Sequence, residues 1–99
     1  MRKIQVLVNQ IDEEICSAKD YAETALEYKA KGNQNWYTRY KEMANDELKH
    51  AMYIHDRAIM EIEELSKVYT SPAEMQEKWD KSHKEYVEKV AWIKQMLNM

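Results

Sequence analysis

The chain contains one glycine and one proline in 99 residues, and these two residues divide it into three long stretches. Gly32 follows the cation Lys31, a combination typical of the end of a helix. Ser71, Pro72 and Glu74 have the form of a capping box with proline at the first helical position. No period-two run bounded by turn residues suggests a strand. The sequence therefore predicts a single all-α domain with helices over about residues 3–31, 36–68 and 72–97.

The first two predicted helices are separated by a very short polar segment. Gly32 is followed by Asn33, Gln34 and Asn35, and either asparagine is a suitable N-cap for the second helix. A connection this short requires the two helices to be antiparallel neighbours. We therefore expect a long antiparallel helical hairpin to which a third helix is added.

Each predicted helix carries one face of apolar, aromatic or small residues at alternating steps of three and four, the spacing of a helix packed against another helix. Two of these faces contain a glutamate, which is costly to bury unless something pairs with it. The faces are Leu7, Ile11, Glu14, Ala18, Tyr21, Ala25 and Tyr28; Tyr37, Tyr40, Ala44, Glu47, Ala51, Ile54 and Ala58; and Trp79, His83, Tyr86, Val90, Ile93 and Leu97.

Glu14, Glu47 and His50 form the candidate metal site. Glu47 and His50 are three residues apart, so they share one face of the second helix. Glu14 lies about as far before the turn as His50 lies after it, which places both at a similar level of the hairpin. Two carboxylates with an imidazole suit iron or manganese and also hold zinc. The simpler alternative is that the glutamates reach the edge of the interface or pair with lysine or arginine.

Tyr21 stands two turns beyond Glu14 on the same face, where its hydroxyl could hydrogen-bond a metal-binding carboxylate. The alternative is a core tyrosine with its hydroxyl at the rim. His83 and Asp80 repeat the acid-x-x-His spacing, and whether they join the site stays open at this point. His55 lies about 80° around the second helix from Glu47 and is expected at the surface.

The residues Glu14 and Tyr21, a turn, and then Asn45-Asp46-Glu47-Leu48-Lys49-His50-Ala51 resemble the ferritin-like superfamily, the rubrerythrin and ferritin group. The resemblance covers about residues 10–65 and is closest to the short half-ferritins of the encapsulated-ferritin type. It implies that two chains pair to complete a four-helix bundle, each giving Glu14, Glu47 and His50 to a shared di-iron site. It also implies iron oxidation, as in a ferroxidase, or iron sequestration. The chain stops at Leu97-Asn98-Met99, where encapsulated ferritins carry a cargo tail, so an encapsulating shell is a doubtful partner.

A different class of function stays open beside this one. The long helices, the charged outer faces, and the three tryptophans and seven tyrosines also suit a helical assembly or partner-binding module that binds little or no metal. Such a module, for example one derived from a phage or mobile element, would keep the scaffold alone. An oxygenase or reductase that uses the same metal pair is a third possibility, for which the sequence offers no argument.

Charge and composition narrow the partners. The formal net charge of −3 is mild, and no basic block or interleaving of aromatic and basic residues is recognised, so no nucleic-acid partner is expected. No apolar run is long enough to span a bilayer, so no membrane partner is expected. The apolar stretch near the first residues is too short for a signal peptide, because polar residues follow it early. Cys16 is the only cysteine and gives no disulfide framework, which fits the cytoplasm. A homodimer or higher homo-oligomer is expected, because two or three long helices leave much apolar surface open.

Overall fold

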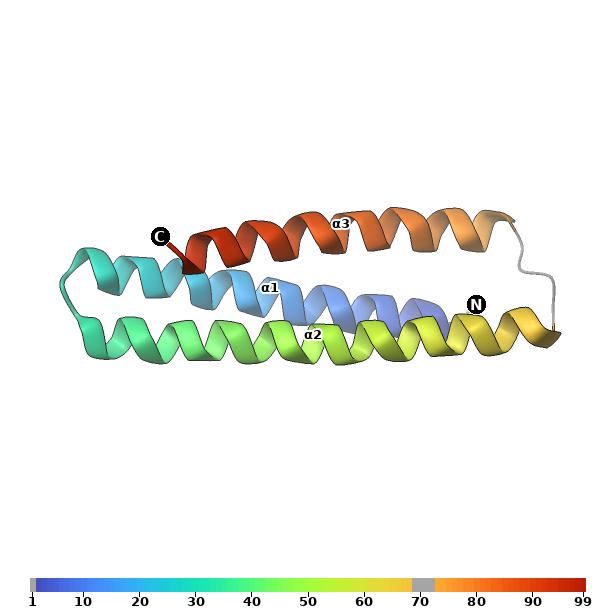
Figure 1. Cartoon of the computed structure of the whole chain (residues 1–99), viewed down its shortest axis with the longest axis horizontal. Coiled ribbons are helices and arrows are strands. Elements are labelled where there is room, and N and C mark those ends of the chain that lie inside the picture. The colour runs from blue at the N-terminus through green and yellow to red at the C-terminus, as the bar shows by residue number, and fades with distance from the viewer. Residues whose placement is uncertain (1, 69–72) are drawn as a thin grey trace.

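The computed structural model describes residues 2–68 and 73–99, and the side chains of residues 2–65 and 76–99. The described residues form three helices, which confirms the all-α prediction: α1 (Arg2–Ala30), α2 (Gln34–Val68) and α3 (Ala73–Leu97). These bounds lie within two residues of those predicted. The predicted capping box of Ser71, Pro72 and Glu74 lies outside the described residues. Figure 1 shows α1 and α2 as an antiparallel hairpin, with α3 running back along it.

The turn between α1 and α2 is built by Gly32 and Asn33. Gly32 has a φ of 74°, the left-handed conformation that L side chains rarely adopt. Its amide donates to the carbonyl of Lys29 at 3.0 Å, and the Asn33 amide donates to the carbonyl of Tyr28 at 2.9 Å. This pair of bonds is a Schellman motif, which satisfies carbonyls at the end of a helix. The Asn33 side chain then accepts from the Trp36 amide at 3.2 Å and caps α2.

Alanines fill the line along which α1 meets α2. Alanine side chains let two helix backbones approach closely, because the distance between helix axes depends on the side chains at the contact. The fully buried alanines of this line are almost completely inaccessible to solvent: Ala18, Ala22 and Ala25 on α1, and Ala44, Ala51 and Ala58 on α2.

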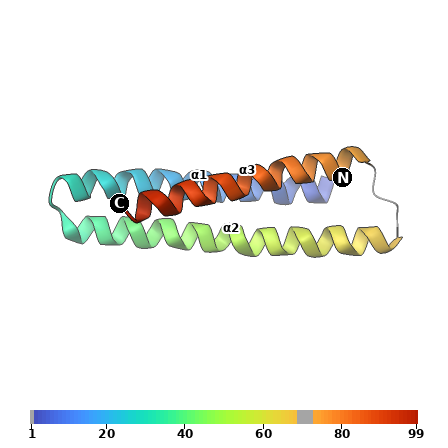
Figure 2. The ribbon, with the colours of Figure 1, turned by 45° about the horizontal axis from the view of Figure 1, so that its top comes forward.

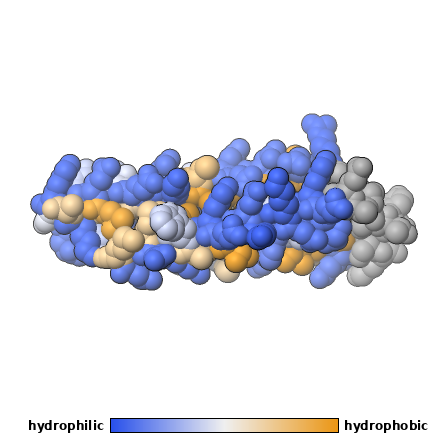
Figure 3. Space-filling view, turned by 90° about the horizontal axis from the view of Figure 1, so that it is seen from above, coloured by the Kyte–Doolittle hydropathy of each residue, from blue (hydrophilic) through white to orange (hydrophobic). Residues whose placement is uncertain are grey.

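One side of the hairpin is covered by α3. Ile93 of α3 is buried in a core cluster with Ile15 of α1 and Leu48 of α2, and Met96 and Leu97 extend the cluster toward the end of the chain. Figure 2 shows α3 crossing over the hairpin on this side. Figure 3 looks onto the α3 side, where hydrophilic residues dominate and apolar residues show in patches between them.

His55 is not at the surface as predicted. Its side chain is only 14% exposed, and its ring stacks on that of Tyr86 with centroids 4.8 Å apart. The rings of His83 and Trp79 lie 5.0 and 5.8 Å from it. The prediction considered only the angle between His55 and Glu47, which lies on the face toward α1. His55 instead faces α3. Its spacing of seven residues from the buried Leu48 was the available signal.

The other side of the hairpin is not covered by α3. Residues turned toward it are half-buried at the edge of the α1–α2 contact. They lie on the opposite flank of the alanine line from Ile15, Leu48 and His55, as the 100° step per residue requires. We call this the open side, and its half-buried residues are Leu7, Glu14, Tyr21 and Tyr28 of α1, with Tyr40, Glu47, Ile54 and Glu61 of α2.

The alanine line can be tested by overpacking it. Ala51→Leu places three extra carbons where α1 and α2 touch, and should destabilise the fold by about 1–3 kcal/mol. Urea unfolding followed by circular dichroism measures the change. The matched control is Ala91→Leu, at an exposed position of α3, which should unfold like the parent. Equal stability of the two variants would show that the helices are not in close contact at Ala51.

Candidate metal centre

The structure brings Glu14, Glu47 and His50 together. The His50 Nδ1 lies 3.5 Å from Oε2 of Glu14 and 3.7 Å from Oε2 of Glu47. One ligand-type atom from each of the three residues falls within 4.8 Å of the others, and in the part of the chain with described side chains this is the one such group of three or more. We call these three residues the triad. The three side chains therefore lie together, and their binding of a metal stays a prediction.

The triad sits at the edge of the α1–α2 contact on the open side. The Glu14 and Glu47 side chains are 28% and 23% exposed, and that of His50 is 53% exposed. Both carboxyl groups are thus partly removed from water, while the imidazole still faces it. The backbone around them is regular helix on both sides, so the two rigid helices fix the positions from which the three side chains start.

The Glu14 carboxyl is close enough to Glu47 to affect the titration of Glu47. A hydrogen bond with the Glu14 carboxyl raises the pKa of Glu47 above its ordinary value of 4.5. Partial burial and the negative charge of Glu14 raise the pKa of Glu47 further, whereas His50 acts in the opposite direction. Ionised Glu47 is therefore electrostatically unfavourable in this position, and a cation there would relieve the conflict.

The simpler alternative, pairing with lysine or arginine, is what the structure shows for another glutamate of α2. Glu61 accepts from Lys3 at 3.0 Å and from Arg57 at 2.9 Å. The hydrogen bonds from Lys3 and Arg57 lower the pKa of Glu61. Among the ion pairs between described side chains, none joins a lysine or arginine to Glu14 or Glu47.

Tyr21 has a different neighbour from the one considered in the sequence. Its ring packs near that of Tyr40, with centroids 6.1 Å apart. In the part of the chain that the structure describes, no hydrogen bond joins the Tyr21 hydroxyl to Glu14 or Glu47. Tyr21 therefore borders the triad along the open side without contacting its carboxylates.

His83 and Asp80 are not part of the triad. The His83 ring lies 6.0 Å from the Trp79 ring and 5.0 Å from the His55 ring, on the α3 side. Asp80 is exposed and accepts a hydrogen bond from Gln76 at 2.9 Å. In this structure His83 therefore packs among aromatic rings away from the triad.

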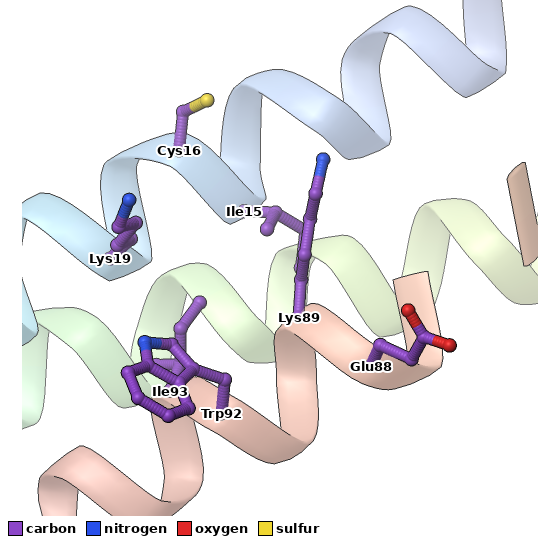
Figure 4. A pocket seen from close by; sticks show the side chains of 7 residues that line it. All are labelled: Ile15, Cys16, Lys19, Glu88, Lys89, Trp92 and Ile93. Carbon is purple, nitrogen blue, oxygen red and sulfur yellow. The ribbon is translucent and has the colours of Figure 1, made fainter. Parts of the chain in front are cut away.

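A separate groove of about 330 Å³ lies between α1 and α3. Figure 4 shows Ile15 and Lys19 on the α1 wall, with Trp92 and Lys89 on the α3 wall. Cys16 lies at the rim on α1 as an exposed free thiol. The groove is on the covered side of the hairpin and shares no residue with the triad.

No protein-family model matches this chain, and neither a curated protein nor a solved structure is detectably similar to it. Over the described residues 2–68 and 73–99, no helix is both long enough and apolar enough to cross a membrane.

The electrostatic conflict at Glu47 predicts a pH-dependent gain from neutralising it. Because the pKa of Glu47 is raised on folding, its ionised form opposes folding at neutral pH. In metal-free protein, Glu47→Gln should raise stability at pH 7 by no more than about 1 kcal/mol. The gain should shrink as the pH falls through the raised pKa, because Glu47 itself is then neutral, and should vanish below about 4.5.

Thermal unfolding measured across this pH range tests the prediction against Asp46→Asn, which neutralises an exposed neighbour on the same helix. The control should show no such gain at neutral pH. A Glu47→Gln variant that is less stable than the parent at pH 7 would mean that the ionised carboxylate already has a favourable partner.

Proposed function

We propose that this chain is a metal-binding, ferritin-like helical protein whose Glu14, Glu47 and His50 bind iron at an interface between two copies. The observation that carries the proposal is the pair of partly buried carboxyl groups, which approach each other beside an imidazole and pair with no lysine or arginine among the described side chains. The hydrogen bond with Glu14, partial burial and the charge of Glu14 raise the pKa of Glu47, and a divalent cation would instead favour its ionised form.

The donor set supports iron among divalent metals. Two carboxylate oxygens and one imidazole nitrogen are ligands that iron and manganese accept, and zinc would also bind them. The atoms already lie within 4.8 Å of one another, so small rotations of the side chains would bring them to a common ion. The open side leaves room for further ligands, which three residues from one chain do not supply.

A second copy of the chain would supply those ligands. The triad lies on the side of the hairpin that α3 leaves uncovered, and two hairpins placed face to face there would make a four-helix bundle. Apolar groups on this side remain open to solvent in part: Trp36 and Met43 are exposed, and Tyr40 and Ile54 are half-buried. A two-fold axis would use one set of ligands twice and close the assembly as a homodimer.

The chemistry of such a site would be oxidation or sequestration of iron. Ferrous iron is then substrate or cargo, and the metal itself supplies the one-electron chemistry toward oxygen or peroxide. The protein's part is to hold carboxylates where the charge of the ion changes and to keep them apart from lysine and arginine. A cytoplasmic location agrees with the single free thiol Cys16.

Metal uptake distinguishes this proposal from a metal-free assembly module. Protein purified without oxygen and titrated with ferrous salt should bind about one iron per chain, or half that number if two chains share one ion. Glu47→Ala should abolish uptake, whereas Asp46→Ala, at the exposed neighbouring position, should bind like the parent. Elemental analysis measures the stoichiometry, and sedimentation velocity should show a dimer.

Unchanged iron binding by Glu47→Ala would contradict the assignment of the site. A parent protein that binds no iron, manganese or zinc, yet gains stability from Glu47→Ala, would favour the assembly module instead. In that case Glu14 and Glu47 would only limit how tightly the two helices pack.

A further inference from the structure

The turn between α1 and α2 carries a concentration of positive charge that the net charge of the chain conceals. Residues 28–41 contain four cations and no acidic residue, so the rest of the chain has a formal charge of −7 where the whole has −3. The same segment holds four of the ten aromatic residues. We call this the turn-end patch, and its charged and aromatic members are Tyr28, Lys29, Lys31, Trp36, Tyr37, Arg39, Tyr40 and Lys41.

Every cation of the turn-end patch lies near an aromatic ring. The Arg39 guanidinium is 5.1 Å from the centre of the Trp36 ring, and the Lys31 ammonium is 5.7 Å from that of Tyr28. The ammonium groups of Lys29 and Lys41 lie 5.4 and 5.7 Å from the Tyr37 ring. These separations are within the range of cation–π attraction, which holds the cations over the rings.

The rings themselves form a connected platform. Tyr28 stacks on Tyr40 with centroids 5.7 Å apart, and Trp36 lies 6.3 Å from Tyr28 and 6.1 Å from Tyr40. Trp36 is nevertheless 42% exposed, so the platform presents an aromatic surface to the solvent at the same end as the cations. Glu27 and Glu42 are the acidic residues that border the segment in sequence.

The turn-end patch lies at one tip of the molecule. Figure 1 shows the hairpin turn projecting beyond the end of α3, so that α1 and α2 alone form this end of a rod about 55 Å long and 17 Å across. Lys29 donates to the main-chain oxygen of Met99 and thereby links the base of the tip to the end of α3. Lys31, Arg39 and Lys41 have exposed or half-buried side chains nearer the turn.

We propose that the turn-end patch docks on an anionic phospholipid surface, with the rod standing on its tip. Lysine and arginine beside tryptophan and tyrosine suit the headgroup region of a bilayer, where the cations meet phosphate and the rings lie at the boundary with the acyl chains. A convex tip fits a flat surface better than it fits an extended strand or peptide, which needs a groove along its length. The charge of −7 on the remainder would be repelled, which favours end-on contact.

This docking is peripheral, so it agrees with the absence of a spanning helix in the described residues. It departs from the expectation of no membrane partner, which rested on the lack of an apolar run long enough to span a bilayer. It also corrects the expectation that basic and aromatic residues are not interleaved in this chain. It uses none of the triad, but it shares Trp36 and Tyr40 with the open side on which a second copy is proposed to pack, so vesicle binding is measured on metal-free protein and read separately from iron binding.

Co-sedimentation of the full chain with lipid vesicles tests the proposal. The protein should bind phosphatidylcholine vesicles that contain phosphatidylserine, fail to bind pure phosphatidylcholine, and dissociate as salt is added. Changing Lys31, Arg39 and Lys41 together to glutamine should lower the partition coefficient about 100-fold, because each cation near such a surface contributes about fivefold. Lys29 is kept, because it contacts Met99.

The matched control changes Lys78, Lys81 and Lys84 to glutamine, three exposed cations of α3. It has the same net charge as the turn-end variant but should bind vesicles at least as well as the parent. A variant with Trp79→Phe and Trp92→Phe, shown by circular dichroism to remain helical, leaves Trp36 as the fluorescent reporter. Its emission should shift to the blue on anionic vesicles.

Any of three results with vesicles would overturn the proposal. These are no binding to anionic vesicles, an equal loss of binding in both triple variants, or an unchanged Trp36 emission in vesicle-bound protein. Tighter binding of the same patch to an oligothymidylate or a polyglutamate than to vesicles would assign it to a nucleic acid or to an acidic protein partner instead.

Discussion

The close approach of two helices along a line of alanines forces a carboxyl group from each helix into the same small space. Ala18 and Ala51 are fully buried, so α1 and α2 leave little distance between the residues beside them. Glu14 and Glu47 each lie four residues, about one helical turn, before one of these alanines and on the same flank of the contact. The effect of Glu14 on the pKa of Glu47 follows from that proximity. The proposed role of the chain depends on this electrostatic conflict and on what relieves it.

Two glutamates at the edge of the α1–α2 contact show different ways of accommodating a partly buried carboxylate. Glu61 is paired with Lys3 and Arg57, and its pKa is lowered. Glu47 lies two heptads earlier on nearly the same stripe, where its neighbours are a second carboxyl group and a half-exposed imidazole. A scaffold selected only for stability would favour an apolar residue or a paired carboxylate at both positions. The difference between them is the structural argument that the triad serves a ligand.

Much of this architecture follows from local sequence rules. Gly32 and Asn33 predict the turn because the conformations they favour are those that end one helix and begin the next, and the structure uses them as a Schellman motif and an N-cap. The triad was predictable because helix periodicity and a short turn fix the relative level of residues on two antiparallel helices. The position of His55 was not predicted, because it depends on α3. The sequence pattern does not say which flank of the hairpin α3 covers, so the half-buried position of His55 was missed.

The turn-end patch escaped prediction for a different reason. Net charge is a sum over the whole chain, so the positive charge of the tip and the negative charge of the remainder largely cancel in it. The stacking of Tyr28 on Tyr40 also joins residues from the two helices, which only the folded hairpin brings together. Tyr21 illustrates the same limit, because its place on the stripe was correct but its ring packs near Tyr40.

Anomalous X-ray diffraction from crystals grown anaerobically with ferrous salt tests the central claim most directly, because it locates the metal and its ligands together. The account predicts an iron peak bound by carboxylate oxygens of Glu14 and Glu47 and by the imidazole of His50, with a second copy of the chain facing it. Density without iron at this position under saturating ferrous salt, with each carboxylate held by a lysine or arginine, would contradict the account and leave a helical scaffold.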